Sequence, residues 1–270
     1  MKIVLIAGNR LLPILLAKAI AHDNNNHELV GICFKGETSR KILPYLDRVY
    51  WINPGEFSRL RSIVKSETAD KCLMAGQISP WRIFFPYAWD TELKSLIETI
   101  DNFCPHTIFT AIINKLEQDG VEFLDSTLFL KTMLAKRGLM NHCPADKDTI
   151  KDVDFGVKMA LRYVDLDIGQ SLCVRNCAVV AAEALEGTDN TIRRALSVAG
   201  KGIVMVKFAK HNQDMRFDVP VVGIKTLQLL RKIGARALVL EENKVLILEK
   251  DRFLALADKY KISIIGVVRI

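Results

Sequence analysis

The sequence lacks the features that mark several large classes of protein. No apolar run approaches the roughly 18 residues of a membrane-spanning helix, and the apolar part of MKIVLIAGN at the N-terminus is too short for a signal peptide. Internal repeats and low-complexity tracts are absent. With 50% hydrophobic and 26% charged residues, the composition excludes disordered, collagen-like and disulfide-scaffold proteins. We therefore expect a globular protein of the cytoplasm.

Familiar catalytic motifs are also missing. The chain has no Walker loop and no GxSxG sequence, and its five histidines share no metal-ligand spacing, which argues against zinc hydrolases and binuclear metallophosphatases. A full GxGxxG is absent, because Gly8 stands alone after the first apolar run. Glu37 comes slightly late for the acidic residue of a dinucleotide site. A nicotinamide-dependent dehydrogenase is therefore a disfavoured alternative.

Cysteine usage indicates a reducing compartment. The six cysteines stand at positions 33, 72, 104, 143, 173 and 177. Only Cys173 and Cys177 are close together, and their CxxxC spacing differs from the CxxC of redox and zinc motifs. We expect buried, apolar thiols rather than disulfides or metal ligands.

The charge balance favours anionic partners. The chain has 38 Lys and Arg residues against 31 Asp and Glu, a formal net charge of +7. Nucleotides, phosphates and an acidic membrane surface all suit such an excess. The basic residues are dispersed and form no run of the nucleic-acid-binding kind, so we expect no nucleic-acid partner.

A chain of 270 residues favours two domains. Over the first third, short apolar strands alternate with helices, a pattern typical of an open parallel sheet of the Rossmann-like kind. We expect strands at 2–7, 28–34, 48–53 and 70–75, helices at 13–22 and 56–66, and mostly helix with one short strand, 121–125, over 90–135.

The second half has a more mixed α/β pattern. The polar segment 136–149 is expected to link an N-terminal Rossmann-like domain, 1–135, to a catalytic α/β domain, 150–270. Expected helices are 150–162, 189–199, 225–234 and 251–260, and expected strands are 171–180, 202–208, 236–241, 244–249 and 262–268. Glu242 and Asn243 are expected to form the turn of a hairpin.

Two loops at the carboxyl ends of predicted strands are candidate ligand sites. Gly8 and Asn9 follow the first strand, and Pro13 marks the start of a helix whose N-terminus would attract a phosphate. Gly76 and Gln77 follow the fourth strand. They should lie at the same edge, where open α/β sheets bind ligands, and the Gln77 amide could contact a nucleobase. Tight turns without a ligand explain both loops nearly as well.

Residues 207–220, KFAKHNQDMRFDVP, form the densest group of charges. Asp214 and Asp218 are four residues apart and could face one hydrated Mg²⁺ from a loop or one helical turn. Lys210 and Arg216 could hold phosphates, and cations beside carboxylates suit phosphoryl transfer. A solvated charged loop is the alternative.

A third candidate site is EALEGTD, residues 183–189. Thr188 or Asp189 could cap the helix that follows, or could place a phosphate or a metal at its start. The turn at Gly169 and Gln170 lies shortly before this motif and is accompanied by further acidic residues.

Several of these stretches together resemble the LpxI family of UDP-2,3-diacylglucosamine pyrophosphatases. They are IAGNRLLP (6–13), LDIGQ (166–170), EALEGTD (183–189), KxxKxxQDxRFDVP (207–220) and Gly223. The likeness runs through most of the chain, keeps the order and spacing of the motifs, and is densest from 166 to 223.

The resemblance implies Mg²⁺-dependent hydrolysis of UDP-2,3-diacylglucosamine to UMP and 2,3-diacylglucosamine 1-phosphate (lipid X), a step of lipid A synthesis. It implies a substrate held in a cleft between two domains, and it places the essential acid on Asp218. We expect Asp218 and Asp214 to be catalytic and to bind the metal. The expected substrate-binding residues are Gly8, Asn9, Pro13, Gly76, Gln77, Gln170, Gly187, Thr188, Asp189, Lys210, Gln213 and Arg216.

A lipid-linked nucleotide-sugar substrate also implies transient contact with the inner-membrane surface, and a homodimer is compatible with the sequence. One departure from the family pattern stands out, because Asn9 and Arg10 replace the consecutive glycines that usually follow the first strand. Asn9 is expected to reach the left-handed backbone region, which Asn tolerates. This change alone favours the alternative of a non-catalytic nucleotide-sugar or lipid-binding protein of the same fold.

Overall fold

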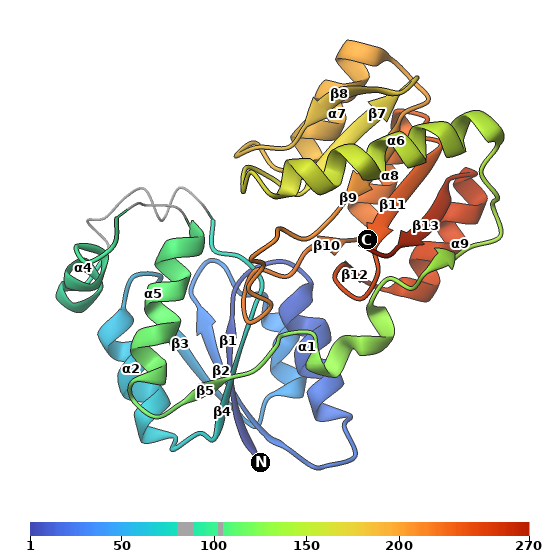
Figure 1. Ribbon diagram of the computed structural model, residues 1–270. Coiled ribbons are helices and arrows are strands. Elements are labelled where there is room, and N and C mark those ends of the chain that lie inside the picture. Colours follow the sequence, from blue (N-terminus) through green and yellow to red (C-terminus); the bar gives the residue numbers. More distant parts are fainter. Residues whose placement is uncertain (80–88, 102–104, 270) are drawn as a thin grey trace. The chain divides into compact units, whose positions relative to one another are not determined.

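The computed structural model describes residues 1–79, 89–101 and 105–269 (Figure 1). The chain forms two compact units. The first consists of Met1–Leu130 together with Asp214–Asp218, and the second consists of Lys131–Gln213 together with Val219–Ile270. The expected domain 150–270 includes Asp214–Asp218, whereas in the structure this segment packs with the first unit.

The first unit is built on a five-stranded parallel sheet with the order β3-β2-β1-β4-β5. Its strands are β1 (Lys2–Ala7), β2 (Glu28–Phe34), β3 (Arg48–Ile52), β4 (Lys71–Ala75) and β5 (Glu122–Phe123). These positions confirm the predicted strands to within two residues. The strands are continuous apolar runs because helices cover both faces of a parallel sheet.

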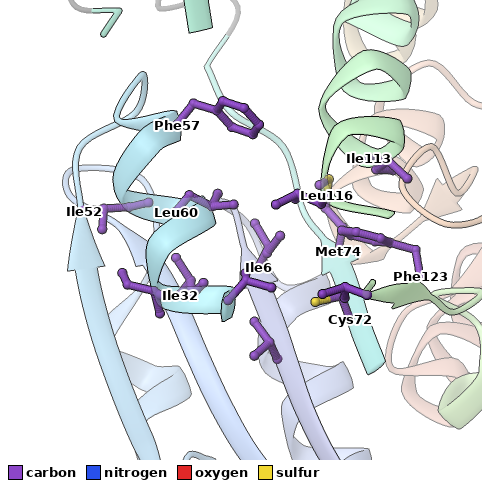
Figure 2. Packing of buried hydrophobic residues seen from close by; sticks show 14 of the residues in the cluster. Ile6, Ile32, Ile52, Phe57, Leu60, Cys72, Met74, Ile113, Leu116 and Phe123 are labelled. Atoms are coloured by element: carbon purple, nitrogen blue, oxygen red, sulfur yellow. The ribbon is translucent and has the colours of Figure 1, made fainter. Parts of the chain in front are cut away.

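Helices pack on both faces of this sheet (Figure 1). They are α1 (Leu12–Ala21), α2 (Phe57–Ser66), α4 (Thr91–Ile97) and α5 (Pro105–Glu117), with 3₁₀ turns at η1 (Arg40–Tyr45) and η3 (Leu128–Met133). On one face, α2, α4 and α5 bury a core against the central strands. Figure 2 shows part of this core, with Leu60 of α2 and Leu116 of α5 packed around Ile6 of β1. On the other face lies α1.

The strand order reverses between β1 and β4. Such a switch point leaves a crevice at the carboxyl ends of the strands, which is where open α/β sheets bind ligands. Gly8 follows β1 and Gly76 follows β4, and the paired residues Ala7 and Ala75 bring the two loops together. The prediction that these loops share one sheet edge is confirmed.

The second unit contains a six-stranded mixed sheet with the order β6-β13-β11-β9-β7-β8. The strands are β6 (Gly138–Leu139), β7 (Ser171–Arg175), β8 (Ala178–Ala182), β9 (Val204–Lys207), β11 (Ala237–Glu241) and β13 (Ser263–Val267). The three strands β9, β11 and β13 are parallel, and the outer strands run antiparallel to their neighbours. The predicted mixed α/β character of this half is confirmed.

Four helices cover this mixed sheet. They are α6 (Lys147–Val164), α7 (Thr188–Ala199), α8 (Ile224–Lys232) and α9 (Lys250–Tyr260). The apolar side of α6, with Val153 and Ala160, packs on one face of the sheet. The other three helices pack on the opposite face through residues such as Ile192, Leu227 and Phe253. Among the described residues, no helix is both long enough and apolar enough to span a membrane.

Two strand predictions in this half are wrong. The expected strand 171–180 is a hairpin, because Asn176 and Cys177 both adopt positive φ (51° and 53°), which suits the two-residue turn that joins β7 to β8. Buried Asp152 accepts hydrogen bonds from the backbone N–H groups of both turn residues, at 3.1 and 2.6 Å, and forms an ion pair with Arg236. The turn is therefore held by a carboxylate on α6.

The expected hairpin between 236–241 and 244–249 does not form. β11 is fully buried and has parallel partners on both sides, β9 and β13. The next segment instead supplies β12 (Leu246–Ile247), which pairs in parallel with β10 (Val221–Val222) in a separate two-stranded sheet. An apolar run specifies burial but not which neighbour it pairs with.

Residues 136–149, expected to link two domains, belong to the second unit. β6 pairs with β13, and the Asn141 side chain accepts a hydrogen bond from the Ile264 N–H and donates one to the Ile262 carbonyl. Asp146 caps α6 by accepting from the Thr149 N–H at 2.7 Å. The polar residues of this segment therefore serve to dock it and to start a helix.

The cysteine prediction holds for some of the thiols. Cys33, Cys72 and Cys173 are buried and free. Cys177 is exposed in the β7–β8 turn and Cys143 is half-buried; the expectation of burial is wrong for these two. Cys104 lies outside the described residues.

Candidate functional site

The two sheet-edge loops of the first unit touch through their backbones. The Gly8 N–H donates to the Ala75 carbonyl at 2.8 Å, and the Asn9 N–H donates to the Gln77 carbonyl at 2.7 Å. A Cβ on Gly76, which has a φ of +89°, would lie 2.5 Å from the Asn9 carbonyl oxygen. The close approach of the loops thus explains the two glycines, as the tight-turn alternative anticipates, and Gln77 is left exposed at the edge.

Glu37 joins three segments at this edge. Its Oε2 accepts hydrogen bonds from Asn9 Nδ2 at 2.6 Å and from the Ser79 hydroxyl at 3.0 Å. The left-handed conformation expected at Asn9 is found at Arg10 (φ 68°) instead. In the sequence, Glu37 is only a poor match to the acidic residue of a dinucleotide site, and this structural role is not predictable, because its partners lie far apart in the chain.

Pro13 occupies the first turn of α1 and is buried. It packs so closely on Gly76 that a Cβ there would lie 2.8 Å from Pro13 Cγ. No side chain of the described residues caps the N-terminus of α1. Pro13 has no N–H and the Ile14 N–H donates to the Leu11 carbonyl at 3.1 Å, so the Leu12 N–H is the group of this first turn that could contact an anionic ligand.

An apolar cavity lies beside the same edge within the first unit. Its volume is about 930 Å³ including the open mouth. Ile6 and Met74 of the sheet, Leu60 of α2 and Ile108 of α5 are among its walls, and Phe217 lines it as well. Gly8, Gly76 and Gln77 also line the cavity. The sequence gives no signal for this cavity, because each lining residue also fits an ordinary core position.

The segment Asp214–Asp218 forms one helical turn. The Asp218 N–H donates to the Asp214 carbonyl at 2.9 Å, so the predicted four-residue spacing does correspond to a turn. Ser126 attaches this turn to the first unit, since its N–H donates to the Met215 carbonyl at 3.0 Å and its hydroxyl lies 2.7 Å from the Arg216 carbonyl.

Asp214 and Arg216 form a two-pronged ion pair. Arg216 Nη2 lies 2.7 Å from Asp214 Oδ2 and Nε lies 3.0 Å from Oδ1, while Nη1 contacts Glu117 of α5 at 2.8 Å. Burial raises the pKa of the Asp214 carboxyl, but the hydrogen bonds from Arg216 outweigh it and hold the pKa below its usual range. The expected roles of Asp214 as a metal ligand and Arg216 as a phosphate ligand stay predictions. The ion pair occupies part of the hydrogen-bonding capacity of both side chains.

The donor set limits how a metal could be held. Among the described residues, no group of three or more His, Cys, Asp or Glu side chains could enclose a metal ion. Mg²⁺ is commonly held by one or two carboxylates together with waters and substrate phosphates, so it does not require an all-protein cage. The half-buried Asp218 carboxylate could supply one such ligand. Both oxygens of Asp214 accept from Arg216.

In the second unit, Thr188 belongs to a buried polar network. Its hydroxyl donates to Glu183 Oε1 at 2.7 Å and accepts from Lys207 Nζ at 3.1 Å. Lys207 is only 4% exposed, and its ammonium lies 3.8 Å from Glu183 Oε2. Because the hydroxyl proton is used by Glu183, this side chain cannot donate it to a phosphate without breaking that bond.

The start of α7 is also not as expected. Gly187, with a φ of 77°, stands at the N-cap, and no described side chain caps the helix. Asp189 instead forms an ion pair with Lys225 at 2.6 Å. The prediction of a Thr188 or Asp189 cap is therefore wrong, and the backbone N–H groups of the first turn are the anion-attracting feature that remains.

Gln170, Lys210 and Gln213 come together in the second unit. Gln213 Oε1 accepts from the Lys210 N–H and from Gln170 Nε2, both at 2.9 Å. Lys210 Nζ lies 2.9 Å from Asp167 Oδ1. The expected site residues thus form a set in each unit: the sheet-edge loops with Asp214–Asp218 in the first, and LDIGQ, EGTD and Lys210–Gln213 in the second.

These features define a two-unit α/β protein whose first unit has a crevice at the switch point of its parallel sheet. Family comparison assigns it further. The model of the LpxI N-terminal domain matches residues 2–133, and the model of the LpxI C-terminal domain matches residues 136–265. The chain belongs to the LpxI family.

One relative matches over nearly its whole length. A protein of Caulobacter vibrioides, UDP-2,3-diacylglucosamine pyrophosphatase LpxI, is 25% identical over 279 residues, covering 98% of this chain and 97% of the relative. Among solved structures, glycinamide-RNase-transformylase T from Mycobacterium tuberculosis aligns with a TM-score of 0.29 and 10% identity. That alignment covers 68% of this chain and 44% of the solved one.

Proposed function

We propose that this protein hydrolyses the pyrophosphate of UDP-2,3-diacylglucosamine to give UMP and 2,3-diacylglucosamine 1-phosphate. The apolar cavity carries the proposal, because its walls include the backbone loops at Gly8 and Gly76 and the ring of Phe217, next to Asp218. A lipid-linked nucleotide sugar needs such a combination of an apolar site for acyl chains and a polar site for phosphates. Membership of the LpxI family supports the same reaction.

Acyl binding would supply much of the affinity. Each buried methylene is worth about 0.8 kcal/mol, so ten of them contribute on the order of 8 kcal/mol before the cost of immobilising the chain. Phosphate contacts are then free to place the reacting bond. Within the first unit, the N-terminus of α1 and the guanidinium of Arg216 are groups suited to hold negative charge.

Asp218 is proposed as the residue that holds Mg²⁺ together with phosphate oxygens of the substrate. When bound, the ion supplies positive charge at the anhydride whose bond breaks. A water oxygen forms the new bond to phosphorus while the P–O bond of the anhydride breaks, and the water proton leaves through a carboxylate or solvent. Arg216, which has N–H donors beyond those paired with Asp214 and Glu117, would stabilise charge on the phosphate oxygens.

The proposed function also implies where the protein acts in the cell. The substrate's acyl chains hold it in a membrane, so a cytoplasmic protein would make transient contact with the inner-membrane surface, and a net charge of +7 suits an anionic leaflet. The homodimer stays a prediction.

The test is an assay of UMP release from UDP-2,3-diacylglucosamine with Mg²⁺, repeated in EDTA. We expect EDTA-sensitive release, and we expect Asp218→Asn to lose at least about 100-fold in kcat while its Kd for the substrate stays within a few-fold. Asp148→Asn is the control, because that side chain is 77% exposed on α6 and should leave kcat unchanged.

Other outcomes favour other functions. Substrate binding without UMP release by the wild type would support the non-catalytic binding protein. Full activity in EDTA would remove Mg²⁺ from the mechanism, and full activity of Asp218→Asn would remove that residue.

A further inference from the structure

Resting on the proposed function, we propose that Phe217 is a positioning residue that couples an acyl chain in the apolar cavity to the catalytic acid. The ring of Phe217 lines the cavity, and the next residue in the chain is Asp218. Both belong to the single turn Asp214–Asp218. One short segment thus contacts the acyl site and carries the carboxylate expected to act on the phosphates.

The Phe217 ring is held by α5. Its centroid lies 5.3 Å from the His106 ring and 5.8 Å from the Phe109 ring, both in tilted arrangements. The side chain is half-buried and packs on the core that α2, α4 and α5 share. The remaining side of Phe217 forms part of the cavity wall, so an acyl chain bound in the cavity would contact Phe217 there.

Hydrogen bonds and an ion pair also attach the turn to the first unit. Arg216 contacts Glu117, and Ser126 contacts the Met215 and Arg216 carbonyls. The turn itself is closed by the hydrogen bond from the Asp218 N–H to the Asp214 carbonyl. Phe217 and Asp218 are neighbours within this hydrogen-bonded turn, with Cα atoms about 3.8 Å apart, so the turn can transmit a shift of the backbone at Phe217 to Asp218.

This arrangement would act on the rate as well as on affinity. Binding energy from a part of the substrate remote from the reaction can be used to set the reacting groups, and truncated substrates then lose kcat rather than only gaining KM. Any nucleotide-diphosphate sugar presents the same anhydride. Contact between the acyl chain and Phe217, next to Asp218, would restrict turnover to the lipid-linked substrate.

The experiment compares kcat and KM on UDP-2,3-diacylglucosamine carrying long acyl chains and on the analogue carrying two- to four-carbon chains. For the wild type we expect kcat to fall by about tenfold or more with the short chains. Phe217→Leu should lower kcat on the long-chain substrate by about tenfold and leave kcat on the short-chain substrate within twofold.

Phe57→Leu is the matched control. Phe57 lines the same cavity from α2 but is not part of the turn, so the same substitution should raise KM for the long-chain substrate and leave kcat unchanged. Thermal unfolding of both variants checks that each folds. If Phe217→Leu does not fold, the comparison of long and short acyl chains on the wild type still tests the inference, because equal kcat values would overturn it.

Equal kcat on long and short chains overturns the inference while leaving the proposed function intact. So does a Phe217→Leu variant that changes only KM, as Phe57→Leu is expected to do. If the wild type turns over neither substrate, both the proposed function and this inference fall.

Discussion

Gly8 and Gln77 approach so closely that Gly8 has no room for a side chain. A Cβ on Gly8 would lie 2.8 Å from the Gln77 backbone nitrogen and nearer still to its carbonyl oxygen. The same carbonyl accepts the Asn9 N–H, so the Gln77 backbone cannot move away without losing that hydrogen bond. The loops after β1 and β4 therefore behave as one backbone unit.

Gly8→Ala should lower the free energy of unfolding by about 1–3 kcal/mol, because the added methyl group meets backbone rather than a flexible side chain. Urea unfolding followed by circular dichroism measures it. The control is Gly223→Ala, whose Cβ would have its nearest neighbour at 3.8 Å and should cost less than about 1 kcal/mol. Equal stability of the two variants would mean that the loops separate easily.

The pair formed by Asp214 and Arg216 predicts a pH dependence. The pKa of Asp214 is lower in the folded protein than the ordinary value of about 3.9. Its contribution to stability is therefore complete above that value and is lost as the pH falls through the folded pKa. Asp214→Asn should cost about 1.5–3 kcal/mol at pH 7, and the difference from wild type should shrink below about pH 4.

Urea unfolding at pH 7, 5, 4 and 3 tests this expectation. Asp148→Asn removes an exposed ion pair at the start of α6 and should cost less than about 1 kcal/mol at every pH. A difference between Asp214→Asn and wild type that is the same at every pH would show that the ion pair does not stabilise the fold.

The Thr188 hydroxyl predicts a stability effect in the second unit. Thr188→Val keeps the shape but removes the hydroxyl that links Lys207 to Glu183, leaving buried polar groups with fewer partners. A loss of about 1–3 kcal/mol is expected, with most of it restored in Thr188→Ser. Thermal unfolding measures both variants, and a Val variant as stable as wild type would exclude the hydroxyl from the network.

The cysteines should differ in reactivity. Burial raises the pKa values of Cys33, Cys72 and Cys173 to about 12. Because the thiolate is the reactive form, these thiols should resist iodoacetamide at pH 8 until the protein is unfolded. Cys177 is exposed and should be labelled in the native protein. Peptide mass spectrometry reads each site, and native labelling of Cys173 would contradict its burial.

The sequence predicts most strands of the first unit because each is an apolar run long enough to be buried on both faces. It does not predict the turn at Asn176 and Cys177, since neither residue is glycine and a cysteine with positive φ is uncommon. Nor does it distinguish pairing of β12 with β10 from pairing with β11, because the same apolar residues suit either neighbour.

The candidate site also has parts that the sequence predicts and parts that it does not. The loops at Gly8 and Gly76 are predictable, because a strand, a glycine and a helix in that order place them at a sheet edge. The pairing of Arg216 with Asp214 and Glu117 is not, since Glu117 lies 99 positions away in the chain and proximity arises only on folding. The cavity is not predictable either, as its walls come from separate elements.

The chain's return to the first unit at Asp214–Asp218 has a consequence for biosynthesis. A ribosome delivers the N-terminus first, at roughly 5–20 residues per second. Ser126 and Glu117 therefore lack their contacts with this segment for several seconds after Leu130 has been synthesised. A gene fragment that ends near residue 130 would encode a first unit permanently missing one of its own pieces, the piece that carries its acid.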